Sequence, residues 1–289
     1  MGALPAGPGV DRNRLISDLT SLATERFSDE GRKRARALLA HRLTTLGFQP
    51  ELQAFATGIN LVGTRPGMPG ATDSGVILLA AHLDTVEGSP GADDNATGLA
   101  AALEMARLFQ APTTRHALRI AFFDQEEAGL MGSRTYTRWP ERTAGLRAVI
   151  VLEMLGATCR VPGCQRVPDD FPFPAPSPIG DFLAAVANDV DPALLPLIMR
   201  ASRPGLPRVF GLPVLEGGRD FPDSRRSDHA PFWDIGLPAV MLTDTADLRS
   251  ARYHGPEDVV EGVDAEFFAG SAQIVANALA ALLDPPVVP

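Results

Sequence analysis

The sequence predicts an α/β protein with a mostly parallel β-sheet that is covered by helices on both faces. Two observations support this fold class. Short apolar runs at residues 76–81, 118–124 and 148–152 have the length of buried strands. Segments in which apolar residues recur at helical spacing lie between and around these runs. Strands that alternate with helices in this way form parallel sheets whose two faces are both covered.

Caps, breakers and apolar spacing define the expected elements. Residues 1–10 are rich in Gly, Pro and Ala and are expected to be frayed, whereas Ser28 can cap a helix that Gly47 ends. Loops at 159–178 and 203–228 are long for a compact fold, and loops of this length are often lids or pocket walls. Helices are expected at 11–23, 28–46, 98–110, 179–190 and 265–283, with a short one before 148, and strands at 51–56, 60–65, 76–81, 118–124, 148–152 and 239–243.

Length and charge narrow the functional classes. A chain of 289 residues without a repeat or a convincing linker suits one α/β domain, so a single domain over residues 1–289 is expected. The formal net charge of −9 disfavours nucleic acid and anionic membranes as partners. The basic run Arg32, Lys33, Arg34 and Arg36 lies on an expected helix and favours a solvated helix face over a nucleic-acid patch.

No segment predicts export or membrane insertion. No apolar run reaches the roughly 18–20 residues that span a bilayer, and the first residues lack the basic start and apolar core of a signal peptide. A cytoplasmic location is expected, or a secreted one if a leader has been removed. Cys159 and Cys164 could form a loop disulfide, although a cytoplasm would keep them reduced. Two cysteines alone do not suffice for a cysteine zinc site.

The chemistry begins directly after the apolar run at 76–81. That run is followed by HLDTVEGSPGADDNATG (residues 82–98), which offers His82, Asp84 and Asp94. Histidine and aspartate at the end of a buried strand are the ligand types of a hard or borderline cation. A polar loop that merely happens to be acidic is the simpler alternative, and the later segments argue against it.

Later strand ends repeat this pattern. Glu126 and Glu127 follow the second apolar run, Glu153 follows the third, and His254 comes after the last expected strand and a loop. In open α/β sheets ligands gather at the carboxyl ends of the strands. Neighbouring residues of an extended chain point opposite ways, so Glu126 and Glu127 are expected to have different tasks, one holding a metal and the other a water.

Four carboxylates in one dry site require cations. Asp94, Glu126, Glu127 and Glu153 would repel one another unless positive charge offset them. Two divalent ions would supply that charge, and two imidazoles would complete a mixed nitrogen and oxygen ligand set that zinc prefers, with cobalt or manganese as alternatives. A carboxylate that bridges two ions about 3.5–4 Å apart is the usual geometry of a two-metal hydrolase. Any one of these residues alone would be read as an ordinary surface or core residue.

Six motifs, in order, resemble the zinc aminopeptidases of the M28 peptidase family, which are two-zinc exopeptidases. They read HLDT, GADDNATG, FFDQEEAGLMGS, LEMLG, SDHAPFWDIGLPAVMLTDT and YHGPED. The resemblance runs from about residue 30 to the C-terminus. It implies a single α/β domain with a mixed, mostly parallel sheet sandwiched between helices. It also implies zinc as cofactor and peptides with a free N-terminus as substrates.

The same resemblance implies which residues hold the two zinc ions. Each ion would have one histidine and one carboxylate of its own, and a further aspartate would be shared. His82 and Glu153 would hold one zinc, Glu127 and His254 the other, and Asp94 would bridge them. The peptide bond after this aspartate is often cis in relatives.

Two further roles follow from the resemblance. Glu126 would be the general base on the bridging water, and Asp84 would orient His82 from behind. His229 in SDHAP has the look of a ligand, but the resemblance assigns that role to His254. We therefore expect His229 to be a structural or pocket-wall residue.

The chain departs from the family pattern at two positions. The family often has aspartate where this chain has Glu153, whose extra methylene changes the reach of the carboxylate. Some members carry an oxyanion-stabilising tyrosine at the position of Ser224, which Arg225 and Arg226 follow here. An arginine or the second zinc is hypothesised to take over the role of that tyrosine.

Two other functions remain open at this stage. Glutaminyl cyclases resemble the same family and use one zinc, so metal content would separate them from the peptidases. A non-catalytic binding module on the same fold is the other alternative, and an intact Glu126 argues against it. Phe221, Phe232 and Trp233, with the loop at 159–178, can line the substrate pocket or belong to the core.

Overall fold

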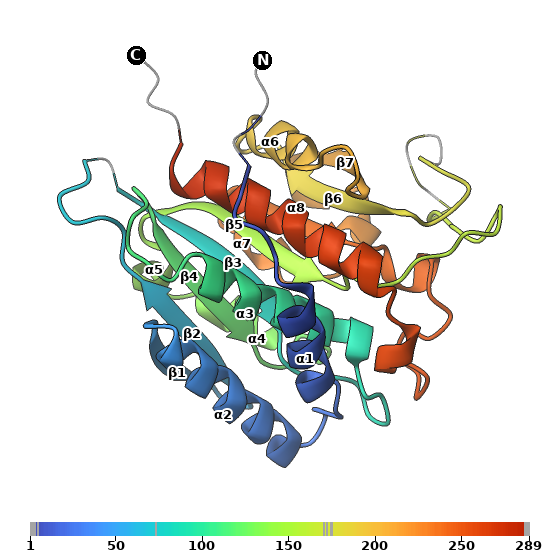
Figure 1. The fold of residues 1–289 in the computed structure, drawn as a ribbon, viewed down its shortest axis with the longest axis horizontal. Helices are drawn as coiled ribbons and strands as arrows, with labels where there is room; N and C mark the ends of the chain where they lie inside the picture. The colour runs from blue at the N-terminus through green and yellow to red at the C-terminus, as the bar shows by residue number, and fades with distance from the viewer. Residues whose placement is uncertain are drawn as a thin grey trace.

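The chain folds around one eight-stranded sheet. The computed structural model describes residues 4, 6–72, 74–169, 171, 173 and 176–285. From edge to edge the strand order is β1-β2-β4-β3-β5-β8-β6-β7 (Figure 1). The strands are β1 (Gln49–Ala54), β2 (Ile59–Arg65), β3 (Val76–His82), β4 (Ala117–Phe123), β5 (Leu146–Glu153), β6 (Phe182–Asn188), β7 (Arg208–Val214) and β8 (Ala239–Thr243).

The sheet is mixed. The pairs β3/β4, β3/β5, β5/β8 and β6/β7 are parallel, and the pairs β1/β2, β2/β4 and β6/β8 are antiparallel. The predicted fold class, an α/β fold with a mixed and mostly parallel sheet between helices, is therefore confirmed. The central strands β4, β3, β5 and β8 run parallel, so their carboxyl ends lie at the same end of the sheet.

Five helices cover the first face of the sheet. They are α1 (Arg12–Leu22), α2 (Asp29–Thr45), α3 (Gly98–Leu108), α6 (Leu194–Ala201) and α8 (Ala265–Leu283), and α8 and α3 cross the front of the view in Figure 1. Leu39, Leu99 and Ile274 from these helices pack with Leu79 of β3 and Ile150 of β5 in the larger core cluster.

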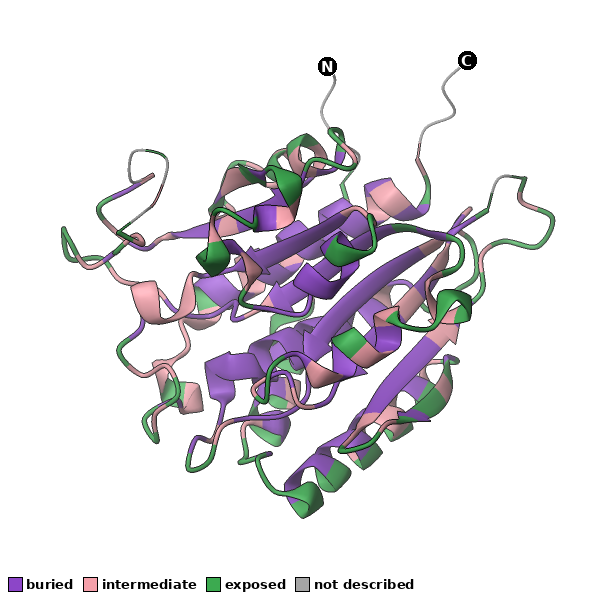
Figure 2. Cartoon of the chain, turned by 180° about the vertical axis from the view of Figure 1, so that it is seen from behind, coloured by how far each residue is buried: buried purple, intermediate pink, exposed green. Residues whose placement is uncertain are grey.

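The second face has a smaller core and fewer helices. α4 (Met131–Thr137) and α7 (Ala230–Asp234) cover it, and Tyr136 and Phe232 from them pack on Leu78 and Val151. Figure 2, seen from this side, shows buried central strands between exposed outer loops and helices. The remaining short elements are α5 (Pro140–Thr143), a π-helical turn η1 (Ala92–Thr97) and the 3₁₀ turns η2 (Glu216–Gly218), η3 (Pro222–Arg225), η4 (Ala246–Leu248) and η5 (Val260–Gly262).

Local sequence signals account for most helix ends. The Ser28 hydroxyl accepts a hydrogen bond from the Gly31 N–H (3.1 Å), as predicted for the cap of α2. Asp264 caps α8 in the same way by accepting from the N–H groups of Glu266 and Phe267, both at 3.1 Å. Each cap satisfies donors that the first turn of a helix leaves unpaired.

The prediction of a helix at 179–190 is wrong. These residues contain β6, which lies between β8 and β7 and is almost wholly buried. The run FLAAVAN is apolar and rich in alanine, and a short run of this kind fits a buried helix or a buried strand equally well. β7 lies in the segment 203–228, so the expectation of a loop there is wrong for Arg208–Val214. Gly211 and Pro213 interrupt the apolar alternation of this strand, which makes it hard to recognise in the sequence.

Helix α8 corrects the statement that no apolar run reaches membrane-spanning length. Its 19 residues are long and apolar enough to cross a membrane by length and composition alone. Most of them are buried against the sheet and neighbouring helices, as in the core helix of a globular domain.

The basic run on α2 is only partly a solvated face. Lys33 and Arg34 are exposed, as expected, but Arg32 and Arg36 are buried. Arg32 Nε lies 3.0 Å from Asp124 Oδ1, and Arg36 Nη1 lies 3.1 Å from Asp124 Oδ2. The two arginines thus fasten α2 to the end of β4, a partnership that the spacing along the helix does not reveal.

Candidate metal centre

Two neighbouring strands end in the first pair of candidate ligands. His82 is the last residue of β3 and Glu153 the last of β5, and these strands are parallel neighbours. Side chains alternate between the faces of a strand. His82 and Glu153 therefore lie on the second face, like Ala80 and Val151 two residues before them. His82 Nε2 is 3.3 Å from Glu153 Oε1.

Asp94 lies between the two candidate histidines. It belongs to η1, the turn between β3 and α3, and the Asp94–Asn95 peptide bond is cis. Its Oδ1 is 2.9 Å from His82 Nε2, and its Oδ2 is 3.2 Å from His254 Nε2. The two oxygens of one carboxylate thus face two different imidazoles.

Glu127 completes the second half of the cluster. Its Oε2 is 3.0 Å from His254 Nε2. The candidate donor atoms of His82, Asp94 and Glu127 all lie within 4.8 Å of one another. The structure therefore brings together the five residues predicted as metal ligands. They form two groups of one imidazole and one carboxylate that share the central aspartate.

The centre of the cluster is buried and its field is strongly negative. His82 is 1% exposed and Asp94 3%, and Glu127 Oε1 is buried with no hydrogen-bond partner among the described residues. Burial lowers the pKa of His254, but hydrogen bonds to Asp94 and Glu127 outweigh burial and raise this pKa to about 10. A field that holds a proton on an imidazole also stabilises a divalent cation. The set of imidazole and carboxylate donors fits zinc.

Sequence comparison assigns the chain to a family. The model of "Peptidase family M28" matches residues 60–203, which contain four of the five clustered residues. The chain belongs to peptidase family M28. An uncharacterised Escherichia coli protein, YfbL, is 32% identical over 66% of this chain and 62% of its own length. The "Probable lipoprotein aminopeptidase LpqL" of Mycobacterium tuberculosis is 28% identical over 72% of this chain and 38% of its own length. This M28 chain thus spans less than two thirds of these two relatives.

Solved structures of low sequence identity share the fold. One is the structure of "BSAP, a zinc aminopeptidase from Bacillus subtilis", with a TM-score of 0.75 at 14% identity over 100% of this chain and 98% of that one. A glutaminyl cyclase from Porphyromonas gingivalis has a TM-score of 0.72 at 18% identity and covers 94% of this chain and 99% of that one. The M28 fold therefore accommodates both activities that the sequence left open.

Asp84 positions the adjacent glutamates of this M28 chain. Its Oδ1 accepts a hydrogen bond from the Glu126 N–H (3.0 Å), and its Oδ2 accepts one from the Glu127 N–H (3.2 Å). The predicted contact of this carboxylate with His82 is longer, at 3.7 Å from Nδ1. His82 Nδ1 lies nearer to the main-chain carbonyl of Asp84, at 3.2 Å. The carbonyl therefore orients the imidazole, while the carboxylate holds the glutamate segment.

Glu126 lies beside the ligand cluster and faces open space. It is 8% exposed and lines the same cavity as Asp94, Glu127 and Glu153. Burial raises the pKa of Glu126 well above its usual range, and the negative charges of Glu153, Asp228 and Glu127 add to the rise. A carboxylate with a raised pKa is suited to accept and return a proton near neutral pH.

A largely apolar cavity extends from the acidic cluster. Its volume is about 410 Å³. Its lining includes Asp94, Glu126, Glu127 and Glu153 of the acidic site, together with Phe182, Ala184, Leu212 and Met241 from β6, β7 and β8. The described residues of the loop at 159–178 contribute Val167 and other apolar side chains to the same lining. The prediction that the loop is a pocket wall is therefore confirmed.

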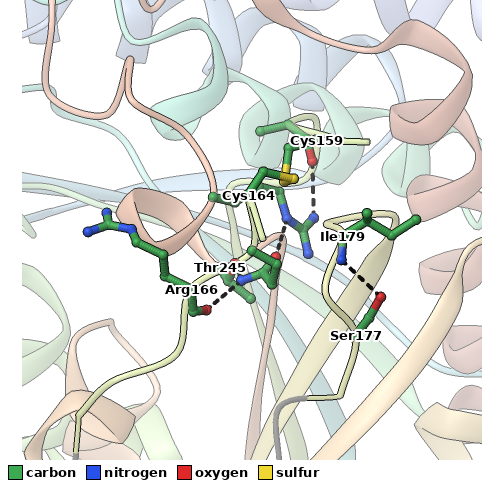
Figure 3. The surroundings of a disulfide bond; sticks show 9 residues. Cys159, Cys164, Arg166, Ser177, Ile179 and Thr245 are labelled. Carbon is green, nitrogen blue, oxygen red and sulfur yellow. Dashed lines mark hydrogen bonds between the residues drawn. A yellow bond between two sulfur atoms is a disulfide. The ribbon is translucent and has the colours of Figure 1, made fainter. Parts of the chain in front are cut away.

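A disulfide and a polar network anchor the start of this loop (Figure 3). Cys159 and Cys164 are joined by the disulfide that the sequence allowed. Gln165 donates a hydrogen bond to the Thr245 hydroxyl (2.9 Å) and accepts one from Arg249 Nε (2.8 Å). Cys159 and Gly180 pair through their main chains at 2.9 and 2.8 Å. The loop is thus closed at its base, next to the cavity.

The structure separates the two arginines that were hypothesised to take over the role of the tyrosine. Arg225 pairs with Asp234 (2.6 Å) and does not line the cavity, whereas Arg226 lines it and pairs with Asp247 at 2.9 Å. Tyr253 also lines the cavity, and its ring stacks on His254 with 3.7 Å between centroids. Its place immediately before a candidate ligand was the sequence signal that could have identified it.

The remaining candidates separate into core and site residues. His229 is fully buried, its Nε2 lies 2.7 Å from the Ser224 carbonyl, and its ring packs on Trp233. Phe232 and Trp233 belong to the smaller core, whereas Phe221 lines the cavity. The structural role expected for His229 agrees with this placement.

Ser227 is a site residue that the sequence did not single out. Its hydroxyl donates a 2.6 Å hydrogen bond to Glu153 Oε2, while Oε1 of the same carboxylate faces His82. This contact orients the carboxylate of Glu153. It connects two residues 74 apart in sequence, so no local pattern indicates it.

Proposed function

We propose that this M28 chain is an aminopeptidase that hydrolyses the first peptide bond of its substrate with two zinc ions. The observation that carries the proposal is the position of Asp94, whose two oxygens face separate histidine and carboxylate pairs. His82 and Glu153 would hold one ion, and Glu127 and His254 the other. Cobalt or manganese could replace zinc in the same donor set.

Glu126 acts as the general base in this proposal. Bound zinc would supply Lewis acidity, activating a water and polarising the scissile carbonyl. Glu126 accepts a proton from the attacking water and passes it to the leaving amine. Burial raises the pKa of the Tyr253 hydroxyl, which therefore stays protonated and can donate a hydrogen bond to the carbonyl oxygen. In this proposal Tyr253 takes the role that the sequence hypothesis assigned to an arginine or to the second zinc.

The cavity selects the N-terminal end of the substrate. A free α-amine, which is positively charged, is attracted to the acidic residues that line the cavity. The first side chain then extends along the wall formed by β6, β7 and β8, where apolar residues dominate. Peptides that begin with a large apolar residue are the expected substrates, because burying that side chain contributes binding free energy.

A substrate panel with metal analysis tests the activity. We expect aminoacyl anilides and dipeptides with leucine or phenylalanine first to be cleaved, N-acetylated versions to be left intact, and a chelator to abolish cleavage. Two zinc ions per chain support the peptidase. One zinc ion together with cyclisation of N-terminal glutamine would instead identify a glutaminyl cyclase, and a folded protein that binds no metal would indicate a binding module.

The variant Glu126→Gln tests the general base. Glutamine keeps the shape of the side chain but cannot accept the proton, so kcat is expected to fall by about 10²–10⁴. Two zinc ions should remain bound, because no imidazole of the cluster contacts Glu126. Glu127→Gln is the matched control and is expected to lose zinc. Loss of zinc from the Glu126 variant would make that residue a ligand and contradict the assignment.

A further inference from the structure

Three consecutive N–H groups at the start of η1 share one acceptor residue. The main-chain carbonyl of Asp258 accepts from the Ala92 N–H at 3.0 Å. Its carboxylate accepts from the next two, Oδ1 from the Asp93 N–H (2.9 Å) and Oδ2 from the Asp94 N–H (3.0 Å). Asp258 therefore caps the turn that carries Asp94, although it lies 164 residues further along the chain.

Asp258 also belongs to the segment that carries His254. It lies four residues after this histidine, in YHGPED, and is 2% exposed. The turn with the bridging carboxylate and the loop with the second imidazole are thus joined through one buried side chain. Movement of either segment relative to the other would break two hydrogen bonds to an ionised acceptor, which are stronger than neutral ones.

Arg26 also holds this turn. It is fully buried, and its Nη2 donates to the Gly91 carbonyl at 3.0 Å while its Nε donates to the Leu83 carbonyl at 2.8 Å. Its positive charge offsets part of the repulsion between the carboxylates of Asp258 and Asp94. A further buried acid beside a metal centre is costly, and this one uses both of its oxygens to hold the main chain.

We propose that Asp258 is a positioning residue that holds Asp94 between the two metal ions and in register with His254. The proposal rests on the proposed two-metal centre but not on the reaction that the centre performs. Asp258 does not touch the imidazoles or the reacting atoms. It acts by setting the place of the turn from which the shared carboxylate projects.

The variant Asp258→Asn is the direct test. An amide has one acceptor oxygen, so it can accept from only one of the two N–H groups and presents its own N–H₂ to the other. We expect the affinity for zinc, measured by competition with a chromophoric chelator, to fall about 10- to 100-fold, the usual effect of losing a partner that orients ligands. Cobalt-substituted protein should show an altered visible spectrum, because that spectrum reports coordination geometry.

Asp264→Asn is the matched control. Asp264 also caps a helical segment by accepting from two N–H groups, and it lies six residues after Asp258. It contacts no candidate ligand. Both N–H groups donate to Oδ1 of Asp264, so the amide oxygen of asparagine can retain them, and the zinc affinity and the cobalt spectrum of this control are expected to stay at wild-type values. Asp258→Glu, which keeps the charge, should recover part of the lost affinity.

The outcomes are separable. Weakened zinc binding and a changed spectrum in Asp258→Asn alone would support the proposal. Wild-type affinity in that variant would overturn it, and so would a variant that cannot fold, because Asp258 would then serve the fold and not the centre. Failure of the wild-type protein to bind zinc would instead reject the proposed function. This result comes from the wild type and not from the Asp258 variant, so the two failures can be told apart.

Discussion

Adjacent glutamates in this protein have different surroundings because one aspartate fixes their main chain. Asp84 accepts the N–H groups of both Glu126 and Glu127, and only Glu127 contacts an imidazole of the cluster. The other glutamate lines the cavity with a raised pKa. At the residue scale, the proposed division between metal ligand and proton acceptor therefore depends on the direction of each side chain, because both residues are glutamate.

Acid stability should depend on His229. This side chain is fully buried, and burial lowers its pKa to about 4 from an ordinary value of 6.5. Between these pH values the unfolded chain binds a proton that the folded protein does not. The contribution of His229 to the free energy of unfolding is therefore fully present above pH 6.5 and is lost as the pH falls toward 4. The linked free energy is roughly 3 kcal/mol.

The variant His229→Gln checks this dependence. Its amide can still donate to the Ser224 carbonyl but does not titrate. Urea unfolding of metal-free protein at several pH values between 7 and 4 should give a free energy of unfolding that falls less steeply than in the wild type. Comparing the two proteins removes the contributions of all other titrating groups. Parallel pH profiles for the two proteins would show that His229 is not the responsible group.

At the element scale, the turn η1 is held by Asp258 and also by its own asparagine. Asn95 Nδ2 donates to the Leu152 carbonyl of β5 (2.8 Å), and its Oδ1 accepts from the N–H groups of Gly98 and Met154, both at 3.2 Å. The turn is therefore bound to β5, the strand that ends in Glu153, and α3 begins directly after it. Small residues at this junction let the helix approach the sheet closely.

Gly98→Ala should destabilise the protein. A Cβ at this position would contact Asn95 Oδ1 at a distance too short for an ordinary contact and Ala81 Cβ at 3.1 Å. The oxygen cannot move away without losing its two hydrogen bonds, so a loss of about 1–3 kcal/mol is expected, as for other overpacked sites. Helix propensity alone favours alanine by at most about 1 kcal/mol. A loss of stability therefore identifies crowding as the dominant effect.

Chemical unfolding measures that loss. Gly9→Ala is the control, because nothing lies within 4 Å of its Cβ position, and its effect should stay within about 0.5 kcal/mol. Equal stability of Gly98→Ala and the wild type would show that the junction has more space than the structure indicates.

At the scale of the whole molecule, the parallel central strands concentrate negative charge. The carboxyl ends of β3, β4 and β5 lie at one edge, and the loops there carry acids that are buried together. Such a site is stable only if positive charge enters it. A bound metal is thus expected to contribute to folding stability as well as to catalysis.

Removal of metal should therefore lower the melting temperature. A metal that binds only the folded protein stabilises it by about 4 kcal/mol when its concentration is a thousand times its Kd. We expect dialysis against a chelator to lower the melting temperature and abolish peptide cleavage, and added zinc to restore both. Magnesium, which prefers an all-oxygen octahedral shell, should restore much less. The same melting curve with and without zinc would contradict a metal site in this cluster.

Local patterning predicted the parts of the fold that depend on periodicity. The apolar runs that became β3, β4, β5 and β8, and the helix that became α8, were all expected. The candidate ligands were recognised because they follow buried strands, and parallel strands end at one edge. The single domain, the cytoplasmic location and the absence of nucleic-acid and membrane partners stay predictions.

Tertiary structure decided what depends on partners far along the chain. Whether the alanine-rich run at 182–188 became a helix or a strand was settled by the space between β8 and β7. Arg32 and Arg36 were buried because Asp124 pairs with them. Asp258 accepts hydrogen bonds from the turn that carries Asp94, which is likewise a contact between segments far apart in the sequence. The sequence by itself determined which residues could bind metal. Only packing determined which of them meet, because contacts between distant segments leave no trace in local spacing.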